Sequence, residues 1–413
     1  MVINSKKYSG VCSCGKEHLM TTELCVIEAG CLARADEYIK EYGFSGRSAA
    51  IYDENTYNAE GLIRPRADIE IILPAECLHA NERGVELLAT QIPADCGYLI
   101  AVGSGTIHDL TRYCAHERNI PFISCPTAAS VDGFCSSVAA MTWHGYKKTF
   151  TAVAPRIVLA DLRVISKAPM RLSRSGFGDM IGKFIALSDW KISNILTDEY
   201  FCHTIYSMTL EATKAVLESA DGIAKGDLEA FEHLTYGLLL SGVAMQLLGN
   251  SRCASGAEHH ISHLIEMQPK ALGLSSSALH GEKVGVGTLL ACGEYKKLRR
   301  STPVFSDYLP RPDAEISNIF GGALGDAVIK ENSPDACLGI TAELLEKKWS
   351  DICAVIDAIP DEDSLIDVYK KLDMVSSLTD IEVSEGSLRA ILEYAPLARN
   401  RLTLLRLRRA IEV

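Results

Sequence analysis

Two histidines in the second half of the chain have the spacing of metal ligands. His259 and His263 are four residues apart, which places both on one face of a helix. Ser255 and Glu258 have the spacing of a capping box, so we expect this helix to begin there and to run towards Pro269. A pair of helical histidines is also common as surface or hydrogen-bonded core residues, so the spacing alone leaves a structural role open.

A third histidine and an acid extend this group. His280 lies at the start of a second expected helix, in which Gly281, Gly285 and Gly287 would allow close packing against the first. Neutral imidazoles and carboxylates are ligands of divalent metals, and a catalytic metal also needs an open position for substrate. Asp179, in a Gly-Phe-Gly-Asp segment, is the candidate carboxylate. The pattern predicts a metal site in which three imidazoles and one acid meet.

A glycine-containing loop has the pattern of a phosphate-binding turn. The apolar run 96–102 predicts a strand, and the segment Gly103 to Asp109 leads from it into a helical pattern over 110–117. Glycines let a ligand approach the backbone, and N–H groups at a helix start face an anion. Because position 108 is His, the third glycine of the full dinucleotide pattern is missing, and an ordinary tight turn is the alternative interpretation.

Two more strands end in polar residues. The strand expected over 119–126 leads to Thr127 and Ser130, whose hydroxyls suit a nucleotide, and to Asp132, which is alternatively a capping residue of a turn. The strand expected over 48–53 ends in Asp53. Its carboxylate would accept hydrogen bonds from a ribose and favour NAD over NADP, although acids at strand ends are also common turn residues.

The elements that position these residues divide into two parts. With 413 residues the chain is longer than one typical core. Strand patterns, with a further strand over 68–74 and a helix over 81–91, alternate in the first part, whereas helices over 186–200, 204–220 and 229–248 dominate afterwards. We therefore expect an α/β dinucleotide-binding domain over 1–162 and an all-α domain over 163–413, with the cofactor in the cleft between them.

Composition excludes several classes of protein. A hydrophobic fraction of 47% with 23% charged residues is typical of a globular protein, and a net charge of -12 argues against non-specific nucleic-acid binding. No secretory signal is visible, and the apolar run over 237–249 is too short to cross a bilayer, so we expect a cytoplasmic protein without a membrane span. The 14 cysteines lack framework spacing and predict reduced thiols. Cys12, Cys14 and His18 form one local cluster, interpreted either as a metal site or as a turn with small buried thiols.

Taken together, these segments resemble the sn-glycerol-1-phosphate dehydrogenase family of bacterial type. That family lies within the dehydroquinate synthase-like superfamily, which also contains metal-dependent glycerol dehydrogenases. The resemblance extends from the strand near Ala49 to the helices beyond His280. It rests on five segments in the family's order, namely Gly103 to Asp109, Pro126 to Gly133, Gly176 to Asp179, Ala254 to His263, and His280 to Glu282.

The resemblance implies roles for individual residues. Those implied to hold NAD or NADP are Gly105, Thr106, Ile107, His108, Asp109, Thr127, Ala128, Ala129, Ser130 and Ser136. Those implied to hold one divalent metal, zinc or nickel, are Asp179, His259 and His280. Asp132, Asp179 and His263 are implied to bind substrate, and Asp179 and His263 to act in catalysis. Position 260 is also a histidine, whereas the family more often has only one histidine after Glu258. On an ideal helix His260 points about 100° away from His259. His259 is therefore the better ligand, because it shares a face with His263.

The implied reaction is the reversible, metal- and NAD(P)-dependent reduction of dihydroxyacetone phosphate to sn-glycerol 1-phosphate, a step of phospholipid biosynthesis, by a homodimer. Lys147, Lys148 and Arg252 are candidates for holding the phosphate, with surface solvation as the alternative, and the basic segment Arg399 to Arg409 is interpreted as a solvated helix face or a dimer contact. Three other functions stay open: a glycerol dehydrogenase, a dehydroquinate-synthase-like cyclase, and a catalytically silent regulator that binds metal and nucleotide.

Overall fold

A computed structural model describes residues 1–143 and 146–413, and only the backbone of residues 146 and 147. The chain forms two compact units, one made of residues 1–180 and 214–250 and the other of residues 181–213 and 251–413. Both units are therefore discontinuous, unlike the domains 1–162 and 163–413 expected from the sequence. The helix Leu228–Leu248 belongs to the first unit because it packs closely against that unit. A Cβ added at Gly242 of this helix would lie only 2.8 Å from Cys135 Cβ.

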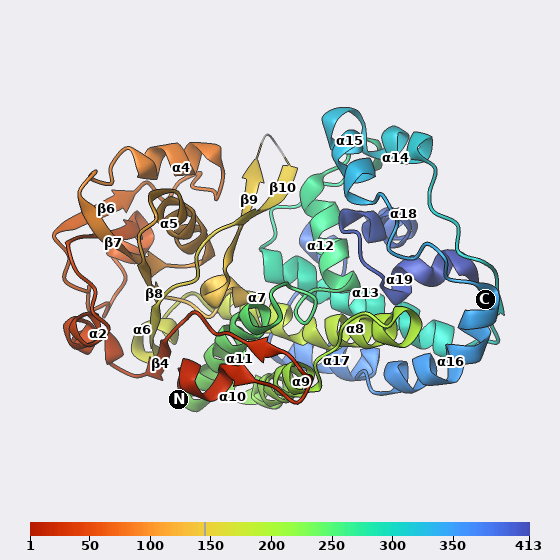
Figure 1. Cartoon of the computed structure of the whole chain (residues 1–413), viewed down its shortest axis with the longest axis horizontal. Helices are drawn as coiled ribbons and strands as arrows, with labels where there is room; N and C mark the ends of the chain where they lie inside the picture. Colours follow the sequence, from red (N-terminus) through yellow and green to blue (C-terminus); the bar gives the residue numbers. More distant parts are fainter. Residues whose placement is uncertain (144–145) are drawn as a thin grey trace. The chain divides into compact units, whose positions relative to one another are not determined.

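The first unit is built on a mostly parallel sheet (Figure 1). Within the described residues this sheet has the strand order β1-β4-β11-β8-β7-β5-β6, in which β1 pairs antiparallel with β4 and the other neighbours pair in parallel. Its strands are β1 Val2–Asn4, β4 Leu24–Glu28, β5 Arg47–Asp53, β6 Ile69–Leu73, β7 Cys96–Gly103, β8 Phe122–Pro126 and β11 Ile157–Asp161. Two small hairpins are β2 Gly10–Val11 with β3 Glu17–His18, and β9 Val138–Trp143 with β10 Tyr146–Thr151.

Helices connect these strands and cover the sheet. They are α1 Ser5–Tyr8, α2 Ala35–Glu41, α3 Glu54–Tyr57, α4 Glu82–Ala89, α5 Gly105–Arg118, α6 Leu162–Ile165, α7 Met170–Ile181, α10 Ala220–Lys225 and α11 Leu228–Leu248, with short 3-10 helices η1 Cys31–Arg34 and η2 Asp132–Cys135. The expected helices over 81–91, 110–117 and 229–248 correspond to α4, α5 and α11. The segment between the expected helices 204–220 and 229–248 contains most of α10.

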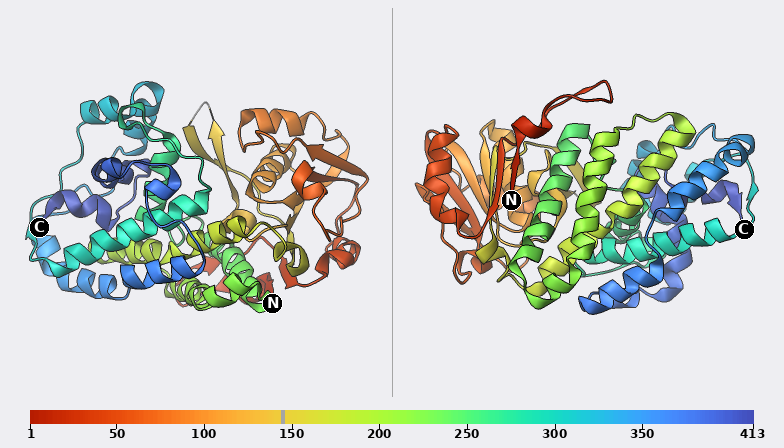
Figure 2. Two further views of the ribbon diagram at one scale, coloured as in Figure 1. Left: turned by 180° about the vertical axis from the view of Figure 1, so that it is seen from behind. Right: turned by 90° about the horizontal axis from the view of Figure 1, so that it is seen from below.

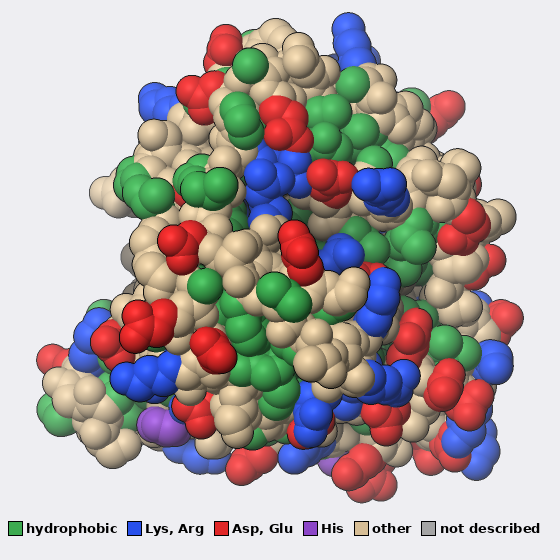
Figure 3. Space-filling model, turned by 90° about the vertical axis from the view of Figure 1, so that its right-hand side faces the viewer, with side chains coloured by type: hydrophobic (Ala, Val, Ile, Leu, Met, Phe, Trp, Pro, Cys, Tyr) green, Lys and Arg blue, Asp and Glu red, His purple; other side chains and the backbone are tan. Residues whose placement is uncertain are grey.

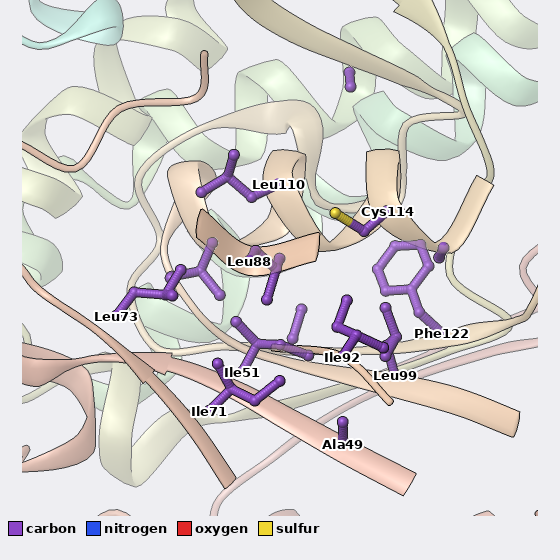
Figure 4. Packing of buried hydrophobic residues seen from close by; sticks show 14 of the residues in the cluster. Ala49, Ile51, Ile71, Leu73, Leu88, Ile92, Leu99, Leu110, Cys114 and Phe122 are labelled. Atoms are coloured by element: carbon purple, nitrogen blue, oxygen red, sulfur yellow. The ribbon is translucent and has the colours of Figure 1, made fainter. Parts of the chain in front are cut away.

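Alternation along the strands explains why the sheet is covered on both faces. In β7, Leu99 belongs to a buried cluster with Leu88 of α4 and Leu110 of α5, as Figure 4 shows from close by. The next residue, Ile100, belongs to a different buried cluster that includes Leu32 of η1. Successive strand side chains point to opposite faces, so a strand that is apolar at every position must be covered on both sides.

The second unit is helical. Its helices are α8 Lys183–Thr197, α9 His203–Glu218, which ends beyond it, α12 Ala257–Met267, α13 His280–Arg300, α14 Asp313–Phe320, α15 Gly322–Glu331, α16 Ala342–Asp357, α17 Glu362–Lys371, α18 Leu388–Tyr394 and α19 Leu404–Leu407. Short elements are the 3-10 helices η3 Lys270–Leu272, η4 Thr379–Ile381, η5 Glu385–Ser387, η6 Ala395–Ala398 and η7 Arg408–Ala410, and the paired strands β12 Val304–Phe305 and β13 Ile411–Glu412. The predicted fold class, an α/β part followed by a helical part, is confirmed.

One expectation about this unit is wrong. Arg406 lies in the basic segment read as a solvated helix face, but it is 2% exposed. It forms an ion pair with Asp335 at 3.1 Å and donates hydrogen bonds to Asn332 and to the Pro396 carbonyl. A buried guanidinium needs such partners, and a charge pattern along the sequence cannot reveal them.

Charged side chains of both signs lie on the surface of the molecule (Figure 3). Figure 3 shows one face of the molecule, on which acidic and basic side chains are intermixed rather than gathered into a continuous basic surface. None of the helices in the described part of the chain is both long and apolar enough to cross a membrane.

Candidate active site

The first unit presents the start of α5 directly after β7. Backbone N–H groups in the first turn of a helix have no partner within the helix, and here the turn begins with Gly105, Thr106 and Ile107. A side chain at Gly103 would lie 2.7 Å from Ile107 Cβ, so the tight turn requires glycine there. This strand, glycine turn and helix start can receive a phosphate.

The two residues that follow support this loop from behind. His108 is fully buried, with Nδ1 donating to the Ser104 carbonyl at 2.9 Å and Nε2 accepting from the Ser124 hydroxyl at 2.8 Å. Burial, which disfavours the imidazolium, lowers the pKa of His108 to about 3. The imidazole therefore braces the turn from inside the core, and any contact of position 108 with a ligand would come from its backbone.

Asp109 anchors a neighbouring segment through a buried arginine. It forms an ion pair with Arg112 at 2.7 Å. The guanidinium of Arg112 is 1% exposed and also donates to the carbonyls of Gly133 and Phe134, at 2.6 and 2.9 Å. Through Arg112, α5 fixes η2 and with it Asp132.

The loop that follows β8 is held by close packing. Thr127, Ala128, Ala129 and Ser130 are each less than a tenth exposed. Ala129 lies against α7, where a side chain at Gly176 would come within 2.0 Å of the Ala129 carbonyl oxygen. Only glycine permits this approach. The Gly-Phe-Gly-Asp segment therefore brings the loop beside the helix that carries the candidate acid.

Asp179 and Asp132 are joined directly. The backbone N–H of Asp132 donates to the Asp179 carboxylate at 3.0 Å, and the Asp132 carboxylate accepts from the Ser241 hydroxyl at 2.9 Å. Asp179 is fully buried. Asp132 is the first residue of η2 and does not cap it, so the alternative interpretation as a capping residue does not hold.

Two other candidate cofactor residues have local structural roles in the first unit. Asp53 caps α3 by accepting from the N–H of Thr56 at 2.8 Å and from its hydroxyl at 3.1 Å. Ser136 is 5% exposed, and its hydroxyl accepts from the Val138 N–H at 3.1 Å. Both oxygens retain further acceptor capacity.

The second unit brings the three histidines together. The ring centres of His259 and His280 are 5.3 Å apart, and that of His263 is 5.9 Å from each. Helices α12 and α13 pack closely because Gly287 has no side chain; a Cβ there would lie 2.6 Å from the Glu258 carbonyl oxygen.

The expected capping box of α12 is wrong. The cap is Gly256 rather than Ser255, and Glu258 accepts from the Gly256 N–H at 2.9 Å. The Ala257 N–H at the start of the helix donates to Asp189 at 2.9 Å. A residue from α8 thus supplies the side-chain acceptor for the start of α12, which local spacing cannot reveal.

Each candidate metal ligand of this unit is oriented by an acid. His259 Nδ1 donates to Glu258 at 2.7 Å, and His280 Nδ1 donates to Glu266 at 2.9 Å. Both rings then keep Nε2 as the lone-pair nitrogen, which is the usual arrangement of metal-binding histidines. One ring nitrogen from each lies within 4.8 Å of the other. The donor chemistry fits a divalent cation.

His263 and His260 have different surroundings. Burial and then the positive charge of Arg399 keep the pKa of His263 well below its usual range, and burial and then Arg401 do the same for His260. His263 also offers a ligand atom within 4.8 Å of both Glu266 and His280, which makes a second possible ligand set. His260 is fully buried, as its different direction on the helix requires.

Of the predicted phosphate-binding residues, Arg252 is committed to partners within the helical unit. Arg252 is 3% exposed, pairs with Glu199 at 3.2 Å and donates to the carbonyls of Asp189 and Leu402, so it holds the helical unit together. Lys148 is exposed, and the side chain of Lys147 lies outside the described residues.

Sequence reasoning missed the residues that orient the ligands. Glu258 and Glu266 were not assigned to His259 and His280, although Glu258 adjoins one of them in the sequence. Arg112 was also missed, and its spacing of three residues from Asp109 was the available signal.

Sequence similarity to known proteins places the chain in a family. A glycerol-1-phosphate dehydrogenase (NAD(P)+) from Bacillus licheniformis is 33% identical over 414 aligned residues, which cover 96% of this chain and 92% of that protein. A protein of the same name from Halalkalibacterium halodurans is 38% identical over 72% of this chain and 76% of its own. The chain belongs to the glycerol-1-phosphate dehydrogenase family. The family resemblance predicted from the sequence is confirmed, and with it the assignment of the chain as an oxidoreductase.

A family model and solved structures also resemble this member of the glycerol-1-phosphate dehydrogenase family. The family model described as iron-containing alcohol dehydrogenase matches residues 26–169. The crystal structure of a probable glycerol dehydrogenase from Sinorhizobium meliloti has a TM-score of 0.62 at 18% identity and covers 94% of each chain, and that of maleylacetate reductase from Agrobacterium tumefaciens has a TM-score of 0.59 at 18% identity and covers 94% of this chain and 95% of its own. At this identity the two structures support the fold alone.

Proposed function

We propose that this protein catalyses the reversible NAD(P)-dependent reduction of dihydroxyacetone phosphate to sn-glycerol 1-phosphate, with one divalent metal, zinc or nickel. The observation that carries the proposal is family membership over nearly the whole chain, combined with two imidazoles that Glu258 and Glu266 orient through their Nδ1 atoms.

The proposed metal ligands are Asp179, His259 and His280. Two imidazoles and one carboxylate leave a divalent ion with net positive charge, and such an ion would polarise the substrate carbonyl as a Lewis acid. Glu258 and Glu266 hold the two rings in the required tautomer. Asp179 is fixed by the Asp132 N–H, so its carboxylate loses little conformational freedom when it binds a cation.

The proposed cofactor site consists of the first turn of α5 and the loop after β8. Gly105, Thr106 and Ile107 would donate backbone N–H groups to the pyrophosphate, while His108 and Asp109 hold the turn and η2 in place. Thr127, Ala128, Ala129 and Ser130 would line the nucleotide, with Asp53 and Ser136 as further contacts. The proposed cofactor is NAD or NADP.

The proposed substrate contacts are Asp132 and His263. Asp132 would accept a hydrogen bond from a substrate hydroxyl. His263 would move a proton through a ring nitrogen, since its Nδ1 has no hydrogen-bond partner among the described residues. Arg399, whose charge is the largest electrostatic influence on His263, is a better candidate for the phosphate than Arg252.

The deciding experiment is product analysis. Metal-free protein is loaded with zinc or nickel and incubated with NADH and dihydroxyacetone phosphate, and the product is separated by chiral chromatography. We expect the sn-1 enantiomer. Equal catalytic efficiency on unphosphorylated dihydroxyacetone would indicate a glycerol dehydrogenase. NADH binding without reduction of either ketone would indicate a silent regulator or a cyclase, since a dehydroquinate-synthase-like cyclase shows no net change in NADH.

The ligand set is tested by matched histidine variants. We expect His280→Ala to lose both metal and activity, and His263→Ala to lose activity while keeping much of the metal. Metal content is measured by mass spectrometry of the purified proteins. Equal metal loss in both variants would favour the alternative set that includes His263 and Glu266.

The assembly and compartment are part of the same proposal. We infer a cytoplasmic homodimer, as the family resemblance implies, and the many buried cysteine thiols suit a reducing compartment. Light scattering during size-exclusion chromatography should then give twice 44.9 kDa, and a monomer mass would refute the dimer.

A further inference from the structure

The N-terminal cluster of two cysteines and one histidine lies on a short hairpin. Strand β2 pairs with β3 through Gly10 opposite His18 and Val11 opposite Glu17, and the Cys12 N–H donates to the Lys16 carbonyl at 2.9 Å. Strands of two residues are marginal in water without further support. Val11 is 87% exposed, so it contributes no apolar packing to the hairpin.

The turn of this hairpin gathers the three side chains. Gly15 has φ +84°, a left-handed conformation that glycine adopts without strain, and its N–H donates to the Cys12 carbonyl at 3.0 Å. Cys12, Cys14 and His18 each offer a ligand atom within 4.8 Å of the others. No disulfide joins the two thiols.

His18 is oriented as a metal ligand would be. Its ring is 6% exposed, and Nδ1 donates to the Leu247 carbonyl at the end of α11 at 2.7 Å. The lone pair of Nε2 therefore faces the turn, where Cys14 Sγ lies at 3.3 Å. A hydrogen bond from His Nδ1 to a backbone carbonyl is the common outer contact of a zinc-bound histidine.

The separation of these atoms is close to that of a zinc site. Zinc–sulfur and zinc–nitrogen bonds of about 2.3 and 2.05 Å, at a tetrahedral angle, place the two ligand atoms about 3.6 Å apart. The 3.3 Å between Cys14 Sγ and His18 Nε2 is near this value. Small adjustments of the turn would admit an ion. A thiol-to-imidazole hydrogen bond is the alternative account of the same distance.

We propose that Cys12, Cys14 and His18 bind a structural zinc ion that uses none of the proposed active-site residues. The ion attaches the hairpin to α11 through His18. Figure 2 shows the N-terminal segment running beside α11 in its right-hand view, and the hydroxyls of Tyr8 and Tyr236, 3.2 Å apart, mark another contact between them. The fourth ligand is a further cysteine of the chain or water.

Cobalt substitution tests the site in the unaltered protein. Metal-free protein is titrated with Co²⁺ and followed by absorption spectroscopy. Thiolate ligation gives an intense charge-transfer band in the near ultraviolet, which two imidazoles and a carboxylate cannot produce. We expect this band with about one equivalent of cobalt. Its absence in folded wild-type protein, or its persistence in a folded Cys12→Ser, Cys14→Ser variant, would overturn the proposal.

Metal counting separates this site from the active site. Protein is purified with zinc, dialysed and analysed for zinc per chain. A His259→Ala, His280→Ala variant should retain about one zinc, and adding Cys12→Ser and Cys14→Ser should remove it. The matched control adds Cys77→Ser and Cys353→Ser instead and should keep the ion. Retention of zinc by the quadruple variant lacking both N-terminal cysteines would refute the site without bearing on the dehydrogenase proposal.

Discussion

Replacing the buried imidazole behind the phosphate loop should change how stability depends on pH. In His108→Asn the amide can still donate to the Ser104 carbonyl, while the Ser124 hydroxyl loses its acceptor. Leaving a buried hydroxyl without a partner costs about 1–3 kcal/mol at any pH. The variant also removes a group whose pKa in the folded protein is about 3.

The size of the pH effect follows from linkage. An unfolded chain protonates this histidine near its ordinary pKa of 6.5, whereas the folded protein does so only near 3. The unfolded state therefore binds more protons in this interval, and the folded state loses stability as pH falls below 6.5. At pH 5.0 the loss is about 2 kcal/mol, from about 1.4 kcal/mol for each unit of pH below 6.5.

The assay is urea unfolding of metal-free protein at pH 7.5 and 5.0, followed by far-ultraviolet circular dichroism. The stability advantage of wild type over His108→Asn should shrink by about 2 kcal/mol at the lower pH. Ser124→Ala is the matched control, because it removes the same hydrogen bond but leaves the buried imidazole, so its difference from wild type should stay nearly constant.

Two results would refute this reasoning. A difference between wild type and His108→Asn that is the same at both pH values would show that the imidazole does not titrate differently in the folded state. A His108 ring signal that titrates near pH 6.5 in the nuclear magnetic resonance spectrum of folded protein would show the same thing directly.

Three further outcomes are expected. Gly176→Ala places a Cβ against the Ala129 carbonyl oxygen and should cost about 3 kcal/mol in urea unfolding, whereas Gly133→Ala, with nothing within 4 Å, should cost less than about 1 kcal/mol; equal losses would contradict the close packing. Glu258→Gln should weaken zinc affinity about 10- to 100-fold in a competition titration because it loosens His259, and unchanged affinity would show that the acid does not matter. Prolonged chelation should abolish NADH oxidation, and added zinc or nickel should restore it; full activity of metal-free protein would exclude a metal-dependent reaction.

Much of the fold was predictable because local patterns carry it. Alternating or continuous apolar runs predicted β5, β6, β7 and β8, and helical spacing predicted α5, α8, α9 and α11. Strands β4 and β11 were not identified, although β11 lies between β4 and β8 in the sheet. Strand order depends on pairing between distant segments, and a five-residue apolar run such as Leu24–Glu28 does not by itself distinguish a strand from a buried helix.

The candidate site was predictable where spacing within one element determines geometry. His259 and His263 share a face of α12, and His280 begins α13, as expected. What could not be predicted are partners supplied by other elements. Glu266 holds His280 from a different helix, and the basic residue Arg406 is buried because Asp335 accepts it. The sequence shows that these groups are charged, whereas only the folded chain shows which of them meet.

Asp189 binds to segments of the chain that are synthesised at different times. This fully buried carboxylate, whose pKa burial raises to about 7, accepts from the Ala257 N–H at the start of α12, from the Tyr295 hydroxyl and from the Leu404 N–H. During synthesis the first of these partners leaves the ribosome long before the last. The histidine-bearing helices therefore stay incompletely braced until the segment that contains Leu404 emerges. Messages truncated before the codon for Leu404 should yield chains that quality control destroys, rather than a shortened working enzyme.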